Sequence, residues 1–261
     1  MIDLHIHSTY SDGTKSPKEL LDLYYETGYR TISITDHETL DGYFKAVDIN
    51  PYKDLRIIPG VELETMYFNK KIHVLAYGFE AGAEQILDFM NKIKICRQTE
   101  AIKLFRKMRL FDQDIYQTVK YENDISIRNI INKMIEKGYG DTKDEIMDKY
   151  FGENGILYIK EFIPSVEEIV CIVKAAGGFV SLAHPFRITQ DRDKVKEIVK
   201  ELTNRGIEGI ECYHPTHSDG DIEFCLKEAS RHELKITGGH DYHRGVVVPS
   251  DFEYISNGFS L

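Results

Sequence analysis

Short apolar runs alternate with longer amphipathic segments along the first and last parts of the chain. Runs of this kind, bounded by turn-forming residues, are typical of β-strands. We expect seven strands, at residues 2–7, 31–36, 56–63, 71–77, 178–183, 207–213 and 234–238. Strands that alternate with helices predict a parallel sheet with crossover helices, and seven such units suggest a barrel.

The middle of the chain breaks this alternation. Residues 96–110, 127–137 and 142–151 read as successive helices with no strand between them. We therefore expect an α/β fold with three parts along the chain: a first part of the barrel at 1–94, an inserted helical cap at 95–160 and a second part of the barrel at 161–261.

The first helix of the insertion is basic. Between Lys92 and Arg109 it carries seven Lys or Arg residues, Arg97 among them, against one acidic residue, Glu100. Charged runs of this kind usually form a solvated helix face. A face that binds phosphate is the alternative.

Composition narrows the functional classes. The 261 residues carry a net charge of −10, which argues against coating a long nucleic acid and leaves room only for a local basic patch. No apolar run reaches the roughly 18 to 20 residues of a membrane span, and the first residues show no secretory signal. The four cysteines have no paired spacing, so we expect no disulfide framework and a reducing cytoplasm. We infer no obligate protein partner.

Histidines and acidic residues gather at the ends of the predicted strands. His5 and His7 lie two residues apart on one strand, so both imidazoles point to the same side. Because active sites in barrels of this type form at the carboxyl ends of the strands, we expect the following nine residues to converge: His5, His7, Asp12, His37, Glu62, His73, His184, Asp241 and His243.

Nine such side chains exceed the ligands that one metal ion can use. The set therefore predicts two or three divalent ions, and imidazole with carboxylate but no thiolate suits Mn, Fe or Zn. We expect Glu62 to bridge two ions and Asp36 to orient a metal-bound histidine from behind. His232 reads as a surface residue, and His240 is compatible with either a supporting role or simple packing.

Five segments carry a family resemblance. They are His5-Ile6-His7-Ser8 with Ser11-Asp12-Gly13, Thr35-Asp36-His37, Gly60-Val61-Glu62, Leu182-Ala183-His184-Pro185 and Gly239-His240-Asp241-Tyr242-His243. In order and spacing they resemble the motifs of the PHP (polymerase and histidinol phosphatase) family. The resemblance implies a distorted seven-stranded barrel with a trinuclear metal centre that hydrolyses phosphoesters.

The resemblance also implies a division of the ligands. By this analogy His5, His7, Glu62 and Asp241 hold the first ion. Glu62 bridges to a second ion held by His73 and His184, and the third ion is held by Asp12, His37 and His243.

Within the family, the helical insertion and the stretch from Tyr213 to Ser218 look like the subgroup that acts on nucleotides. It includes 3′,5′-nucleoside bisphosphate phosphatases and a related 5′ to 3′ exonuclease that trims short oligonucleotides. The resemblance therefore implies a small phosphorylated substrate: a nucleoside bisphosphate, a nucleoside monophosphate or a short 5′-phosphorylated oligonucleotide. Two departures from the family pattern bear on the choice of substrate: His240 stands where a small residue is usual, and no histidine follows Asn129 within the insertion.

Residues for the reaction come from the resemblance, in which Arg128 and Arg187 align with phosphate-binding positions, and from the needs of phosphoester chemistry. Attack by a hydroxide that bridges the ions needs no covalent nucleophile, and the chain has no serine elbow or phosphate-binding glycine loop. Arg128, Arg187 and Arg97 are candidates to bind the phosphate, each with a surface ion pair as the alternative. His217 is a candidate to give a hydrogen bond or a proton to the leaving group. A histidinol-phosphate phosphatase and a noncatalytic metal-binding module remain alternatives.

Overall fold

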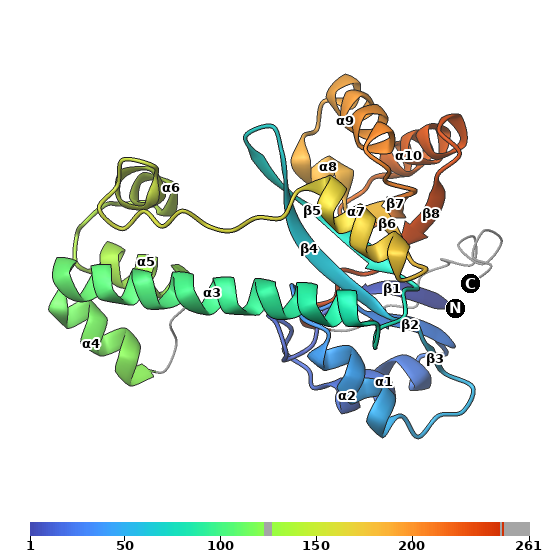
Figure 1. Ribbon diagram of the computed structural model, residues 1–261, viewed down its shortest axis with the longest axis horizontal. Helices are drawn as coiled ribbons and strands as arrows, with labels where there is room; N and C mark the ends of the chain where they lie inside the picture. The colour runs from blue at the N-terminus through green and yellow to red at the C-terminus, as the bar shows by residue number, and fades with distance from the viewer. Residues whose placement is uncertain (123–126, 246, 248–261) are drawn as a thin grey trace. The chain divides into compact units, whose positions relative to one another are not determined.

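The computed structural model describes residues 1–122, 127–245 and 247. It divides the chain into two compact units, residues 1–91 with 163–261 and residues 92–162. The elements of the first unit (Figure 1) are, in chain order, β1 (Ile2–Ile6), α1 (Pro17–Glu26), β2 (Thr31–Ile34), α2 (Asp41–Ile49), β3 (Arg56–Ile57), β4 (Gly60–Tyr67), β5 (Lys70–Tyr77), the start of α3 (Glu84–Phe111), α7 (Val166–Ala175), β6 (Phe179–Leu182), α8 (Pro185–Ile188), α9 (Arg192–Asn204), β7 (Gly209–Tyr213), α10 (Asp219–Arg231) and β8 (Lys235–Gly238).

The strands form two sheets. One sheet is parallel with the order β1-β2-β3, and the other has the order β4-β5-β6-β7-β8. Hydrogen bonds join their edges, because His7 N donates to Tyr242 O at 2.8 Å and Glu62 N donates to Thr35 O at 3.2 Å. The α/β class is as expected, but the described strands number eight and their two sheets do not form the predicted closed seven-stranded barrel.

The difference arises between residues 56 and 77. The single strand predicted at 56–63 is broken, since β3 ends before Pro59, a residue with no backbone N–H to give to a ladder. β4 and β5 then form a hairpin with only Phe68 and Asn69 between them. So short a connection allows antiparallel pairing alone, whereas a parallel pair needs a crossover of a dozen or more residues.

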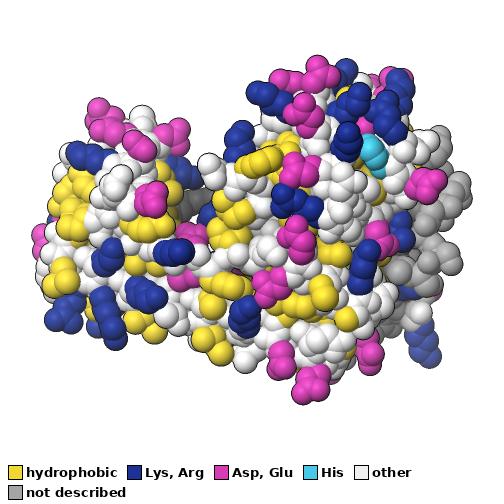
Figure 2. Space-filling view, turned by 45° about the horizontal axis from the view of Figure 1, so that its top comes forward, with side chains coloured by type: hydrophobic (Ala, Val, Ile, Leu, Met, Phe, Trp, Pro, Cys, Tyr) yellow, Lys and Arg dark blue, Asp and Glu magenta, His cyan; other side chains and the backbone are white. Residues whose placement is uncertain are grey.

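Helices cover the sheets and complete the core of the first unit. Helix α2 packs beside β2 and β3, α7 against β6, and α10 against β7 and β8 (Figure 1). The larger apolar cluster joins β1 and β2 to α1 through side chains such as Ile6, Ile34 and Tyr24. On the face shown in Figure 2, acidic and basic side chains intersperse and little imidazole reaches the surface. Across the chain five histidines are buried and the other five are partly buried; the buried ones are His5, His7, His184, His214 and His217.

All the regular secondary structure described in the second unit is helical. It contains the rest of α3, then α4 (Gln113–Glu122), α5 (Ile127–Glu136), α6 (Lys143–Ile146) and the short π-helix η1 (Met147–Phe151). Leu104 and Met108 of α3 pack with Ile115, Ile131 and Ile146 in its core. None of the helices in the described part of the chain is long and apolar enough to cross a membrane.

Candidate metal centre

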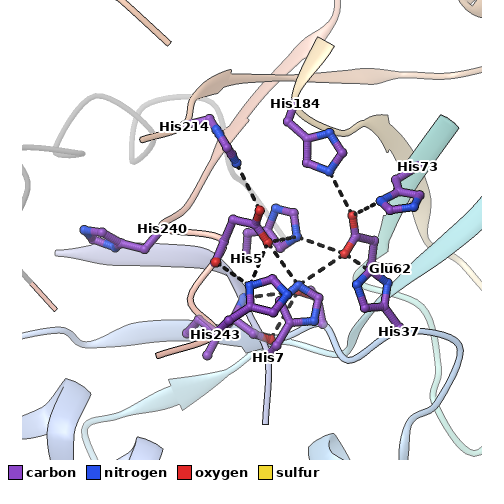
Figure 3. Close-up of polar contacts among 12 residues, drawn as sticks. His5, His7, His37, Glu62, His73, His184, His214, His240 and His243 are labelled. Carbon is purple, nitrogen blue, oxygen red and sulfur yellow. Dashed lines mark hydrogen bonds and ion pairs between the residues drawn. The ribbon is translucent and has the colours of Figure 1, made fainter. Parts of the chain in front are cut away.

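The nine candidate ligands meet at one edge of the first unit. We call these nine residues the rim cluster. The labelled members in Figure 3 point toward a common centre, and His240 lies apart from them. Because β5 runs antiparallel, His73 reaches this edge from the amino-terminal half of its strand and not from the carboxyl end. The hydrogen bond from Ala183 N to His73 O, at 3.2 Å, places it beside the segment that carries His184.

Glu62 lies at the centre of the rim cluster. Its side chain is 1% exposed, and its two oxygens face different imidazoles. Oε2 lies 3.2 Å from His5 Nε2 and His7 Nε2 and 3.3 Å from His37 Nδ1. Oε1 lies 2.9 Å from His73 Nδ1 and 3.0 Å from His184 Nε2. This carboxylate has the position of a bridge between two groups of ligands.

Asp241 faces the same centre with one oxygen. Its Oδ1 lies 3.3 Å from His5 Nε2 and 3.2 Å from His7 Nε2. Its other oxygen, Oδ2, contacts Arg187 at 2.6 Å and His214 at 3.3 Å. The two oxygens therefore have separate partners.

Asp12 belongs to the part of the rim cluster that contains His37 and His243. Its Oδ1 lies 3.2 Å from His243 Nε2 and 3.9 Å from His37 Nε2. The loop that carries it folds back on β1, where a Cβ at Gly13 would lie 2.2 Å from His7 O. Only glycine fits this approach, so the turn predicted from Ser11-Asp12-Gly13 has a steric basis.

Asp36 supports that loop in a way that differs from our expectation. Its carboxylate accepts hydrogen bonds from Ser8 N at 2.7 Å, Ser8 Oγ at 2.6 Å and Ser11 Oγ at 2.6 Å. These contacts hold the backbone between His7 and Asp12. Asp36 thus positions the Asp12 loop and does not orient an imidazole within the described residues.

Three sets of side chains could each hold a metal ion, because the ligand atoms within each set lie within 4.8 Å of one another. They are His7, Asp12, His37 and His243; His5, His7, Glu62 and Asp241; and His37, Glu62 and His73. The second set equals the one implied for the first ion. His7 belongs to the first and second sets, His37 to the first and third, and Glu62 to the second and third. His184 is in none of them and contacts the Oε1 side of Glu62.

The donor set fits divalent ions. Both ring nitrogens of His7 are buried and make no hydrogen bond among the described residues, although Glu62 Oε2 and Asp241 Oδ1 each lie 3.2 Å from Nε2. A buried polar atom without a hydrogen bond is costly, whereas a cation between the imidazole and these carboxylates would use the lone pair of the ring. Imidazole and carboxylate together suit Mn, Fe or Zn.

The electrostatics of the carboxylates point the same way. Burial alone would raise the pKa of Glu62, but His5, His184 and His7 more than offset it and hold the pKa well below its usual range. Burial also opposes ionisation of Asp12, yet contacts with His243, His37 and His7 lower its pKa to about 2. At neutral pH both groups are therefore charged and available to cations.

Glu211 was not predicted, although it is fully buried beside the rim cluster. One carboxylate oxygen lies 2.8 Å from His5 Nδ1 and the other accepts from His184 N at 2.6 Å. A carboxylate behind an imidazole fixes the ring so that its far nitrogen keeps a free lone pair. The indication in the sequence was a charged residue between Ile210 and Cys212 in an otherwise apolar strand.

Glu211→Gln is expected to weaken metal binding by about 10- to 100-fold, as changes behind a ligand commonly do. The amide offers one acceptor oxygen where the carboxylate meets two donors. Metal titration followed by elemental analysis measures the effect. Glu208→Gln is the matched control, since Glu208 pairs with Lys174 on the surface. Unchanged affinity in Glu211→Gln would contradict the orienting role.

Asp3 and His240 form a buried pair beside this region. Asp3 Oδ2 lies 2.6 Å from His240 Nδ1, and Oδ1 accepts from His5 N at 3.1 Å. This answers the question left open for His240, which contacts Asp3 and supports the backbone before Asp241. His232 ends α10, half-buried, 3.6 Å from Glu228.

The backbone is strained at two members of the rim cluster. His184 has φ 26° and Asp241 has φ 48°, where side-chain-bearing residues rarely lie. Such conformations persist where the surrounding structure fixes them, often at functional sites.

The four candidate substrate residues have different positions. Arg187, in α8, contacts Asp241 at the rim cluster. Arg97 donates to Glu100 and to Phe162 O, both at 2.9 Å, so its partners lie within its own unit, as in the ion-pair alternative. Arg128 lies in α5, but its side chain is outside the described part of the structure. His217 is buried near His214, with ring centroids 5.3 Å apart.

Comparison with models of known protein families shows to which family the chain belongs. A model of the PHP domain matches residues 3–211. The chain belongs to the PHP domain family. The resemblance inferred from its motifs is thereby confirmed.

Curated relatives of this PHP chain cover nearly its whole length. A 5′-3′ exoribonuclease of Haemophilus influenzae is 22% identical over 92% of this chain and 89% of its own. A phosphoribosyl 1,2-cyclic phosphate 1,2-diphosphodiesterase of Eggerthella lenta is 24% identical, with coverage of 92% and 93%. A 3′,5′-nucleoside bisphosphate phosphatase of Chromobacterium violaceum is 24% identical, with coverage of 93% and 87%. The chain is a phosphoesterase of the PHP family.

A solved structure supports the fold. A protein of Bifidobacterium adolescentis, described as a metal-dependent phosphoesterase, superposes with a TM-score of 0.72 at 23% identity. The match covers 98% of this PHP chain and 94% of the other. At this identity the likeness speaks for the fold and not for a shared substrate.

Proposed function

We propose that the protein hydrolyses phosphate esters of nucleotides with two or three divalent ions held by the rim cluster. The observation that carries the proposal is Glu62, whose two buried oxygens separate two groups of imidazoles. Bound divalent ions supply a water of lowered pKa and positive charge opposite the phosphate oxygens. The substrate is a nucleoside 3′,5′-bisphosphate, a nucleoside monophosphate or a short 5′-phosphorylated oligonucleotide.

The geometry supports the division of the ligands that the family resemblance implies. His5, His7, Glu62 and Asp241 hold one ion, and Asp12, His37 and His243 hold another with His7 nearby. A third position lies on the Oε1 side of Glu62, where His73 and His184 both point.

Of the three candidate arginines, Arg187 is the one whose described side chain reaches the rim cluster, so we assign it to the substrate phosphate. Its side chain is 52% exposed while one nitrogen contacts Asp241 at 2.6 Å. A guanidinium has five N–H donors, so contact with Asp241 leaves others for a phosphate beside the rim cluster.

Arg187→Ala is expected to lower kcat/KM for nucleotide substrates by roughly 10- to 150-fold, the value of one charge-assisted contact. Arg192→Ala is the matched control, because Arg192 is equally exposed and pairs with Asp221 away from the rim cluster. Metal content measured in both variants separates lost phosphate binding from lost ions. Equal rates for Arg187→Ala and the wild type would remove Arg187 from the site.

The experiment that tests the nucleotide proposal is a substrate screen. Phosphate release is measured from adenosine 3′,5′-bisphosphate, mononucleotides, histidinol phosphate and p-nitrophenyl phosphate, and shortening is followed for 5′-phosphorylated RNA. A ribosyl cyclic phosphate is included because one relative is named for such a substrate. We expect the highest kcat/KM for a nucleotide or short RNA.

Two other results would replace the proposal. A preference for histidinol phosphate would make the chain a small-molecule phosphatase of the same family. No turnover of any ester by metal-loaded protein would favour a noncatalytic metal-binding module.

A further inference from the structure

His214 is a buried histidine at the rim cluster that belongs to none of the sets of potential ligands. It directly follows β7, is 4% exposed, and lies with its ring centroid 5.4 Å from that of His184. Its Nε2 lies 3.3 Å from Asp241 Oδ2 (Figure 3). The question is whether this nitrogen carries a lone pair or a proton.

The backbone of Thr216 answers it. Thr216 N donates to His214 Nδ1 at 3.2 Å, and Thr216 Oγ1 lies 2.8 Å from the same nitrogen. A backbone N–H is only a donor, so Nδ1 must offer its lone pair. In the neutral ring the proton is then on Nε2, which donates to Asp241 and has no lone pair for a cation.

His5 shows the opposite arrangement. Its Nδ1 faces the carboxylate of Glu211 at 2.8 Å, so the proton lies there and Nε2 keeps a lone pair toward the centre of the rim cluster. The local partners thus make His5 suitable as a ligand and His214 suitable as a donor.

The other donor to Asp241 Oδ2 is less fixed. Arg187 contacts this oxygen but is half exposed, whereas His214 is enclosed. A change in the exposed guanidinium would therefore still leave the buried imidazole on the carboxylate.

In its neutral form, His217 cannot take the place of His214 as a hydrogen-bond donor through Nε2. Its Nδ1 lies 2.9 Å from Cys212 O, an acceptor, so Nδ1 carries the proton and Nε2 of the neutral ring is an acceptor. That Nε2 is buried without a partner among the described residues. The donor role predicted for His217 would therefore require the doubly protonated ring.

We propose that His214 is a positioning residue that donates through Nε2–H to Asp241 Oδ2 and keeps that oxygen turned away from the ions. Asp241 then offers Oδ1 alone, on the side of His5 and His7. The inference rests on the metal centre of the proposed function but is independent of the choice of substrate.

The test uses substitutions that keep or remove the donor. Glutamine carries an amide N–H near the position of Nε2, and leucine has a similar volume without a donor. Asparagine also has an amide, but its side chain is too short to bring the N–H to Asp241. His232→Leu is the matched control, because His232 lies at the end of α10. Mn²⁺ affinity and the visible absorption of Co²⁺-loaded protein are measured for each variant, with circular dichroism as the check on folding.

We expect His214→Leu and His214→Asn to weaken Mn²⁺ binding by about 10- to 100-fold and to change the Co²⁺ spectrum. His214→Gln and His232→Leu should stay near the wild type. Wild-type affinity and spectrum in His214→Asn or in folded His214→Leu would overturn the inference. So would a His214→Gln as defective as His214→Asn, since packing and not donation would then be the cause.

The same measurements separate this inference from the proposed function. A wild-type protein that binds no Mn²⁺, Fe²⁺, Zn²⁺ or Co²⁺ would overturn both. Wild-type binding that the His214 variants retain in full would overturn the role of His214 alone.

Discussion

Glu62→Gln is expected to lower kcat/KM for any phosphate ester by roughly 1,000-fold or more. The carboxylate faces imidazoles on both sides, so the amide would remove the negative charge that we propose two ions share, and would turn an N–H₂ group toward one set of ring nitrogens. Loss of about 4 kcal/mol of charge stabilisation in the transition state corresponds to this factor. Steady-state kinetics with p-nitrophenyl phosphate and a nucleotide measure it.

Glu64→Gln supplies the control for that substitution. Glu64 lies two residues further along β4 and contacts Lys71 at 3.3 Å, so its loss should leave the rate nearly unchanged. Circular dichroism and thermal unfolding show whether both variants remain folded. Activity of Glu62→Gln within tenfold of the wild type would mean that Glu62 does not bridge ions.

Removal of metal is expected to abolish phosphate release, with a loss of at least about 100-fold and recovery on addition of Mn²⁺. The reason is the arrangement around His7, which is buried, makes no hydrogen bond among the described residues, and faces the carboxylates of Glu62 and Asp241. Elemental analysis before treatment with a chelator should find two or three Mn, Fe or Zn ions per chain. A chelated, metal-free protein that keeps its full rate would refute the metal centre.

The positions of the strands could be predicted because each apolar run is short and bounded by turn-forming residues. The direction of β5 could not be read from periodicity, since a strand has the same pattern in either direction. The hairpin was hidden because its turn contains Phe68, with φ 50°, where glycine or asparagine is usual. The gap between the predicted strands was nevertheless too short for a crossover helix, and that alone indicated antiparallel pairing.

The rim cluster could be anticipated from histidines and acids at strand ends. Its supporting residues could not, because their roles depend on contacts between distant segments. Glu211 meets His5 from across the sheet, and the role of His214 depends on the backbone of Thr216. Asp36 stands beside His37 in sequence, yet it binds the serines of another loop.

The positive φ angles at His184 and Asp241 lower the stability of the folded protein at two residues that we assign to the metal centre, so natural selection keeps them only while the centre is used. Each such residue costs on the order of 1 to 2 kcal/mol that glycine would avoid. In a lineage that no longer needs the reaction, mutation would replace these two residues with glycine or asparagine before it eroded the apolar core. The identities at positions 184 and 241 therefore distinguish descendants that still use the centre from those in decay.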